Sequence, residues 1–230
     1  MKSSVLDRVF DGVMLCLMLA ALYLVFIWVP NEKTMGIIQR VFYFHVPAAW
    51  VGFLAFGIVF IASIAYLVKR NDNWDLIAAI SAELGLVFCS IMLITGPIWA
   101  KPVWGIWWTW DPRLTLALVL WLIYVAYVML RIYVTDEGKR ARLSAVVGII
   151  GFLDVPLVYM SIRWWRTQHP GAVLSIRTGG GKMDPAMESI LFQNAVALLM
   201  LAAVMVAVRM RQEDTQREVE SLRRYAHAAV

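Results

Sequence analysis

The stretch VFYFHVPAAWVGFLAFGIVFIASIAYLV, residues 41–68, contains no Asp, Glu, Lys or Arg. A helix needs roughly 20 apolar residues to cross the hydrocarbon core of a bilayer, and this run is longer than that. The whole chain has the same character, since 61% of its 230 residues are hydrophobic and its mean hydropathy is +0.70. Soluble domains have about 45–50% apolar residues. The sequence therefore predicts an integral membrane protein.

Five further stretches are apolar enough to span a bilayer, so we expect an all-α fold with six transmembrane helices. The six stretches are Gly12–Val29, Val41–Val68, Leu76–Ala100, Leu114–Leu130, Leu143–Ile162 and Ser189–Val208. Two of them carry an acid, Glu83 and Asp154, for which we expect structural or partner-binding roles. We predict one membrane domain over residues 1–208, and a charged tail over residues 209–230 that is either a short amphipathic helix or solvated.

Six spans place both termini on one side, and the loops near residues 30–41, 100–113 and 163–188 on the other. Most of the 21 Lys and Arg residues fall on the side of the termini. The positive-inside rule then predicts cytoplasmic termini. The net charge of +5 is spread over short loops and the tail, so topology explains it and we expect no nucleic-acid partner.

Tryptophan is concentrated on the predicted outer side. Of the eleven tryptophans, only Trp74 lies clearly toward the termini, whereas a symmetric aromatic belt would mark both interfaces. The segment KPVWGIWWTWDPRLT, residues 101–115, holds Trp104, Trp107, Trp108 and Trp110. If residues 103–110 form a helical turn or two that starts at Pro102, the first three indoles share one face. That face is either a binding platform or an interfacial anchor.

Asp111 has two interpretations at this stage. Asp followed by Pro is a favourable helix start, with Asp as the N-cap and Pro at the first helical position. Asp184 and Pro185 repeat this pair before the sixth span. Asp111 is therefore either purely structural or part of the tryptophan platform.

Two of the three histidines lie on the tryptophan side. His45, in FYFHVPAAW, is at the outer end of the second span, and His169, in WWRTQHP, follows the fifth. His227 is in the tail and is expected to be unremarkable. A lone interfacial histidine is usually only a hydrogen-bonded polar residue, but two in aromatic surroundings indicate a metal centre, because imidazole binds iron, copper, zinc and nickel well.

The type of metal centre follows from the surroundings of the histidines. A bare zinc ion needs further ligands, for which the outer loops offer only a few carboxylates, those of Glu32, Asp111, Asp184 and Glu188. An aromatic platform instead suits haem, which needs axial ligands, apolar contacts for the ring and cations for its propionates. The cations closest in sequence are Arg113, Arg163 and Arg166.

These motifs resemble a known family. WGIWWTWDPRLT is similar to the tryptophan-rich WWD segment of the haem-handling membrane proteins of cytochrome c maturation. FYFHVPAAW and SIRWWRTQHP are similar to the histidine-bearing stretches that flank that segment. The length and the six predicted spans are similar to the small branch of the family, the maturation C proteins, and the resemblance covers the chain up to the tail.

The resemblance implies that haem b is bound at the periplasmic face of the bacterial inner membrane and presented to a haem chaperone, maturation protein E, for covalent attachment. His45 and His169 would be the axial ligands of the haem iron. The platform for haem and chaperone would comprise Trp104, Gly105, Trp107, Trp108, Trp110 and Asp111. The implied partners are the ABC transporter subunits A and B and the small membrane protein D.

We do not expect an enzyme. GGGKM, residues 179–183, lacks the spacing and the hydroxyl of a phosphate-binding loop. Cys16 and Cys89 form no Cys-x-x-Cys pair, so neither thiol redox chemistry nor covalent haem attachment is expected. Two alternatives remain open: a membrane b-type cytochrome that carries electrons, and a transporter subunit that conducts haem.

Overall fold

The structure is a computed structural model that describes residues 5–170 and 183–228. Its helices are α1 (Val5–Tyr23), α2 (Phe42–Lys69), α3 (Asp72–Trp104), α4 (Pro112–Tyr133), α5 (Glu137–Trp164) and α6 (Pro185–Ala228). A π-helical turn, Leu24–Trp28, extends α1, and a 3-10 turn, Ile37–Val41, precedes α2. Six helices in the described part of the chain are long and apolar enough to cross a membrane. The all-α, six-span prediction is confirmed, and the chain is a multi-pass membrane protein.

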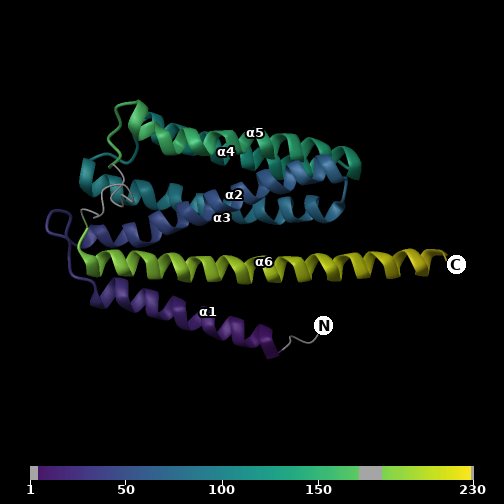
Figure 1. Cartoon of the computed structure of the whole chain (residues 1–230), viewed down its shortest axis with the longest axis horizontal. Helices are drawn as coiled ribbons and strands as arrows, with labels where there is room; N and C mark the ends of the chain where they lie inside the picture. The colour runs from purple at the N-terminus through teal and green to yellow at the C-terminus, as the bar shows by residue number, and fades with distance from the viewer. Residues whose placement is uncertain (1–4, 171–182, 229–230) are drawn as a thin grey trace.

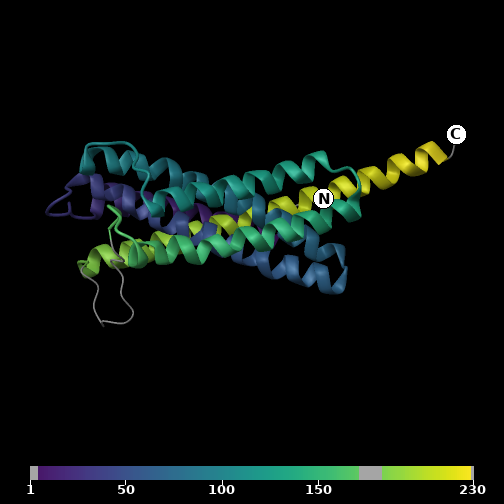
Figure 2. The same cartoon turned by 90° about the horizontal axis from the view of Figure 1, so that it is seen from above.

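The helices run side by side along one axis (Figure 1). α2 and α3 form the centre of the bundle, α4 and α5 pack on one side of them, and α6 lies on the other side with α1 against it. Both described chain ends lie at one end of the bundle, together with the turns between α2 and α3 and between α4 and α5 (Figures 1 and 2). We call this the terminal end, and the opposite end, with the three longer loops, the loop end. That the terminal end is cytoplasmic remains a prediction.

Small residues allow the central helices to approach closely. A Cβ added at Gly85 of α3 would lie 2.4 Å from Cε1 of Phe56 on α2. The ring of Phe56 in turn stacks on that of Tyr124 of α4, with centroids 3.6 Å apart. Such contacts of small and aromatic side chains are what holds helices together in lipid, where burying apolar surface provides no driving force. The bundle centre is therefore a rigid frame for the loop end.

The helix predicted over residues 103–110 is not formed. α3 runs past Ala100 and contains both Pro97 and Pro102, so Pro102 does not start a helix. α3 ends because Gly105 adopts φ 78°, a left-handed conformation that favours glycine, with its N–H bonded to the Lys101 carbonyl at 3.0 Å. Trp104 is thus the last residue of α3, and the residues from 106 to 111 are irregular.

The tail is helical, because α6 continues without a break through Arg209 to Ala228 and projects past the bundle (Figure 2). The predicted boundary at 208/209 is a change of composition inside one helix. Arg209 also explains Glu83: its Nε donates to Glu83 Oε2 at 2.8 Å, which joins α6 to α3. Asp154 of α5 is buried, and its Oδ2 has no hydrogen-bond partner among the described residues.

Candidate functional site

Asp111 caps α4 at the loop end. Its Oδ1 accepts from the backbone N–H of Leu114 at 3.0 Å, its Oδ2 accepts from the Thr109 hydroxyl at 3.3 Å, and Pro112 follows at the first helical position. The N-cap interpretation of Asp111 is therefore confirmed. Its carboxylate anchors the tryptophan-rich loop to the start of α4.

Arg113 lies in the first turn of α4 and is partly buried. Its Nη1 donates to the backbone carbonyl of Val158 on α5 at 3.1 Å. The carboxylate of Asp111 and the phenol of Tyr159 are also close enough to interact electrostatically with this guanidinium. Arg113 thus holds a positive charge at the loop end without a carboxylate hydrogen bond.

His45 lies in the first turn of α2 and is partly buried. Its Nδ1 is 3.0 Å from the hydroxyl oxygen of Thr95 on α3. Gly96 makes room for the imidazole, because a Cβ there would lie 3.4 Å from His45 Cε1. The ring is therefore fixed between α2 and α3. Sequence reasoning missed Thr95, since 50 positions separate it from His45 and nothing in its local sequence marks it.

His169 follows α5 in an irregular segment. Its backbone N–H donates to the Thr167 hydroxyl at 3.1 Å, and its Nδ1 lies 2.9 Å from the Pro170 carbonyl oxygen. Burial lowers the pKa of His169 to about 4, and the positive charge of Arg113 acts in the same direction. The imidazole is therefore neutral at neutral pH, which is the form that binds metals.

The structure brings three predicted site residues together. The imidazoles of His45 and His169 interact electrostatically with each other, and both interact with the guanidinium of Arg113. These residues come from the start of α2, the segment after α5 and the start of α4, which all lie at the loop end (Figure 1). The two histidines and the arginine predicted for the site thus lie at the same end of the bundle, and their binding roles remain a proposal.

The tryptophans form pairs rather than one helical face. The rings of Trp99 and Trp104 meet edge to face at 5.1 Å, and those of Trp108 and Trp110 do so at 5.8 Å. Trp107 and Trp110 are 59% and 75% exposed. The Nε1 of Trp108 is buried and has no partner among the described residues. The loop end therefore offers exposed indoles next to an indole N–H that is free to donate.

Nothing in the described residues supports a bare metal site. No group of three or more His, Cys, Asp or Glu side chains is gathered there in a way that could hold an ion. Glu32, one of the carboxylates considered for zinc, accepts from Thr34 N and Met35 N at 2.7 and 2.6 Å. Hydrogen bonds from Thr34 and Met35 lower the pKa of Glu32, so this carboxylate is engaged in its own turn.

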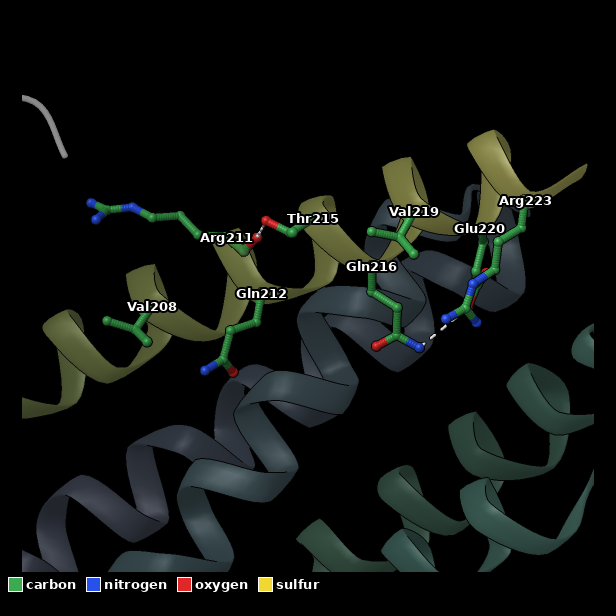
Figure 3. A pocket seen from close by; sticks show the side chains of 8 residues that line it. All are labelled: Val208, Arg211, Gln212, Thr215, Gln216, Val219, Glu220 and Arg223. Carbon is green, nitrogen blue, oxygen red and sulfur yellow. Dashed lines mark hydrogen bonds between the residues drawn. The ribbon is translucent and has the colours of Figure 1, made fainter. Parts of the chain in front are cut away.

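A surface hollow runs along α6 between Val208 and Arg223 (Figure 3). It is lined by one helix only, and two of its polar side chains bond within that helix: Thr215 to the Arg211 carbonyl and Gln216 to Glu220. It lies toward the terminal end, whereas the start of α2, which carries His45, is at the loop end (Figure 1). The candidate site is therefore the loop end and not this hollow.

Fold and site together define a six-span membrane protein with two histidines and an arginine converging at one end. A family model described as Heme exporter protein C matches residues 2–225. The chain belongs to the heme exporter protein C family.

Three relatives illustrate the similarity. Heme exporter protein C of Bradyrhizobium diazoefficiens is 34% identical over 194 residues, 84% of this chain and 73% of the relative. Heme exporter protein C of Escherichia coli K12 is 35% identical over 182 residues, 79% of this chain and 73% of the relative. A Marchantia polymorpha protein with the provisional name cytochrome c biosynthesis ccmC-like mitochondrial protein is 33% identical over 150 residues, 65% of this chain and 63% of the relative.

Proposed function

We propose that this protein binds haem b at its loop end and presents it to the haem chaperone, maturation protein E, during the biogenesis of c-type cytochromes. The observation that carries the proposal is that His45 and His169, from segments far apart in the sequence, lie at the same end of the bundle and close enough to interact electrostatically with Arg113. The names of the relatives support the same cargo and pathway, because they are called heme exporters and, in Marchantia, a protein of cytochrome c biosynthesis.

The residues present fit haem better than a bare ion. The porphyrin supplies four nitrogen ligands to its iron, so two imidazoles complete the set, whereas a bare ion would need more protein ligands than the described residues gather. Exposed indoles offer apolar contact to the ring. Arg113, which has no carboxylate hydrogen bond, would bind a propionate, because charge-assisted bonds from arginine to carboxylates are strong.

Haem is cargo in this proposal, and the protein's contribution is to hold and orient it. Axial ligation by histidines is reversible, so the haem is retained without a covalent bond and can leave. The exposed side chains of Trp107 and Trp110 give the chaperone a surface beside the haem edge. Holding the two reactants in a fixed geometry converts their encounter into an effectively intramolecular step.

The location and partners follow from the same proposal. With the termini in the cytoplasm, the loop end faces the periplasm across the bacterial inner membrane. ATP hydrolysis then falls to the ABC transporter subunits A and B, with protein D as a further membrane partner.

The test is to co-express the protein with its chaperone, purify it in detergent and record its absorbance spectrum. We expect a Soret band in the wild type that falls at least about tenfold in His45→Ala and in His169→Ala, in line with the loss of an axial ligand, together with less haem on the chaperone. His227→Ala is the matched histidine control and should leave both unchanged. Unchanged haem content and delivery in the first two variants would contradict the proposal, and reversible reduction by a quinol would favour an electron carrier.

A further inference from the structure

Two hydroxyl groups on α3 make the same kind of hydrogen bond to a ring nitrogen of a neighbouring helix. The Ser90 hydroxyl donates to the Leu86 carbonyl at 2.8 Å, and its oxygen lies 2.8 Å from Nε1 of Trp121 on α4. The Thr95 hydroxyl donates to the Ile91 carbonyl at 2.7 Å, and its oxygen lies 3.0 Å from Nδ1 of His45 on α2.

The first pair is a guide to the direction of the bond in the second. A hydroxyl has a single proton, and in both residues a carbonyl four positions earlier takes it. The oxygen can then only accept from the ring nitrogen. An indole N–H is always a donor, so the Ser90–Trp121 pair shows that this geometry is an N–H···O bond. The same arrangement of hydroxyl, carbonyl and ring nitrogen favours donation from Nδ1 of His45 to Thr95.

A neutral imidazole has one N–H and one lone pair. If Nδ1 of His45 carries the proton, Nε2 holds the lone pair. The carbonyl of Met92, another group of α3 that can only accept, also interacts with this imidazole. Among the described residues, Thr95 is the one side chain hydrogen-bonded to this ring, and it lies at Nδ1, so no side-chain hydrogen bond competes with a ligand for Nε2.

His169 has the same tautomer, but a different group fixes it. Its Nδ1 lies 2.9 Å from the Pro170 carbonyl oxygen, which can only accept, so Nδ1 carries the proton and Nε2 the lone pair. The backbone sets the tautomer of His169, and this cannot be lost by substituting a side chain. At His45 a side chain, Thr95, does so.

We infer that Thr95 is a positioning residue for the cargo: it fixes the tautomer and ring orientation of His45 so that Nε2 is the atom presented to the haem iron. The inference rests on the proposed function and adds a residue to it. A hydrogen bond at the far nitrogen also makes an imidazole a stronger donor, and losing such a partner typically costs about 10–100-fold in metal affinity. Thr95 would therefore affect both the affinity of His45 for iron and the electron density that its imidazole donates to the iron.

The test uses three variants of the full chain, loaded with ferric haem in detergent. Thr95→Val keeps the shape and removes the hydroxyl, and Thr95→Ser keeps the hydroxyl. Ser90→Ala removes the equivalent hydroxyl from the same helix without touching a histidine. The measurements are the haem dissociation constant, the electron paramagnetic resonance spectrum of the ferric complex and its reduction potential.

We expect Thr95→Val to weaken haem binding about tenfold or more, to alter the low-spin signal and to raise the potential, because a less electron-rich imidazole stabilises ferric iron less. Thr95→Ser should stay within about twofold of the wild type, and Ser90→Ala should leave the signal and the potential unchanged.

Three results separate the possible failures. A wild-type spectrum and affinity in Thr95→Val, with haem lost in His45→Ala, would overturn the role of Thr95 and leave the proposed function intact. Equal changes in Thr95→Val and Ser90→Ala would also overturn it, since both hydroxyls would then act only through the packing of α3. Unchanged haem binding in His45→Ala would overturn the proposed function itself.

Discussion

The two ends of the bundle handle charge in different ways. At the terminal end, arginines meet carboxylates: Arg131 forms two bonds with Asp75 at 2.6 and 2.8 Å, and Arg211 pairs with Asp7. At the loop end, Arg113 and Arg40 donate instead to backbone carbonyls and one amide oxygen, and the described part of that end contains no ion pair.

Three carboxylates of the loop end accept hydrogen bonds from backbone N–H groups. Asp111 caps α4, Asp184 accepts from the N–H of Ala186 at 2.8 Å, and Glu32 closes its own turn. Among the described residues, none of these three carboxylates forms an ion pair with a cation of that end, which supports the proposal that Arg113 binds an anion from outside the chain. This difference is consistent with a terminal end that stabilises the bundle, and it supports the proposal that the loop end binds a ligand.

The largest effect on stability is expected at the terminal end. The Arg131–Asp75 pair is partly buried, with side chains 18% and 16% exposed, so Asp75→Asn leaves an unpaired charge and should cost about 3 kcal/mol of the free energy of unfolding. Thermal unfolding in detergent measures this. Glu213→Gln, which removes the two weaker pairs with Arg209 and Arg217 at 3.5 Å, should cost under about 1 kcal/mol. Equal losses in the two variants would break the comparison.

Arg113 tests the binding end. Arg113→Gln should weaken haem binding about tenfold, or 1.4 kcal/mol, because a propionate loses its charge-assisted bond. Arg113→Lys should retain part of the affinity. Arg142→Gln removes the same charge from an exposed arginine at the start of α5 and should have no effect. The haem affinities of the three variants are measured by haem titration followed by absorbance. Equally reduced affinities in Arg113→Gln and Arg142→Gln would show that general charge, not the position of Arg113, matters.

Gly105 tests how the tryptophan-rich loop is placed. Gly105→Ala puts a side chain at φ 78° and should cost about 1–2 kcal/mol, as measured by thermal unfolding. Gly12→Ala, in α1 with no atom within 4 Å of an added Cβ, should be neutral or stabilising by up to about 1 kcal/mol. A loss in both variants would mean that the left-handed conformation of Gly105 is not what matters.

The last effect is confined to acidic pH and is the titration of His169. Its folded pKa of about 4 lies below the ordinary value of about 6.5, so between these two values the unfolded chain binds the proton more readily. The contribution of His169 is thus constant above about pH 6.5 and destabilising as the pH falls toward 4. Thermal unfolding of haem-free protein should lose less stability on acidification in His169→Asn than in the wild type. Parallel curves would contradict the lowered pKa.

Much of the fold could be predicted from the sequence, because a bilayer imposes a length and an apolar composition on each span. The N-caps at Asp111 and Asp184 were also readable, since capping is local. The path of residues 103–110 could not be predicted in this way. The spacing of the indoles is compatible with a helix, but the left-handed conformation of Gly105 ends α3 there.

The site was predictable in part for the same reason. The histidines stood out by type and by their aromatic neighbours, and parity placed them on one side. Thr95 and the contact of Arg113 with Val158 depend on pairs of residues that are far apart in the sequence. Only the packing of α2 on α3 and of α4 on α5 brings those pairs together.

The central claim is that His45 and His169 bind the same iron. The most direct measurement is the electron paramagnetic resonance spectrum of ferric haem in wild type and in His169→Gly, before and after addition of free imidazole. We expect a low-spin, bis-imidazole signal in the wild type, its loss in the variant, and its return when imidazole fills the vacated position. A variant with the wild-type signal and no response to imidazole would contradict it.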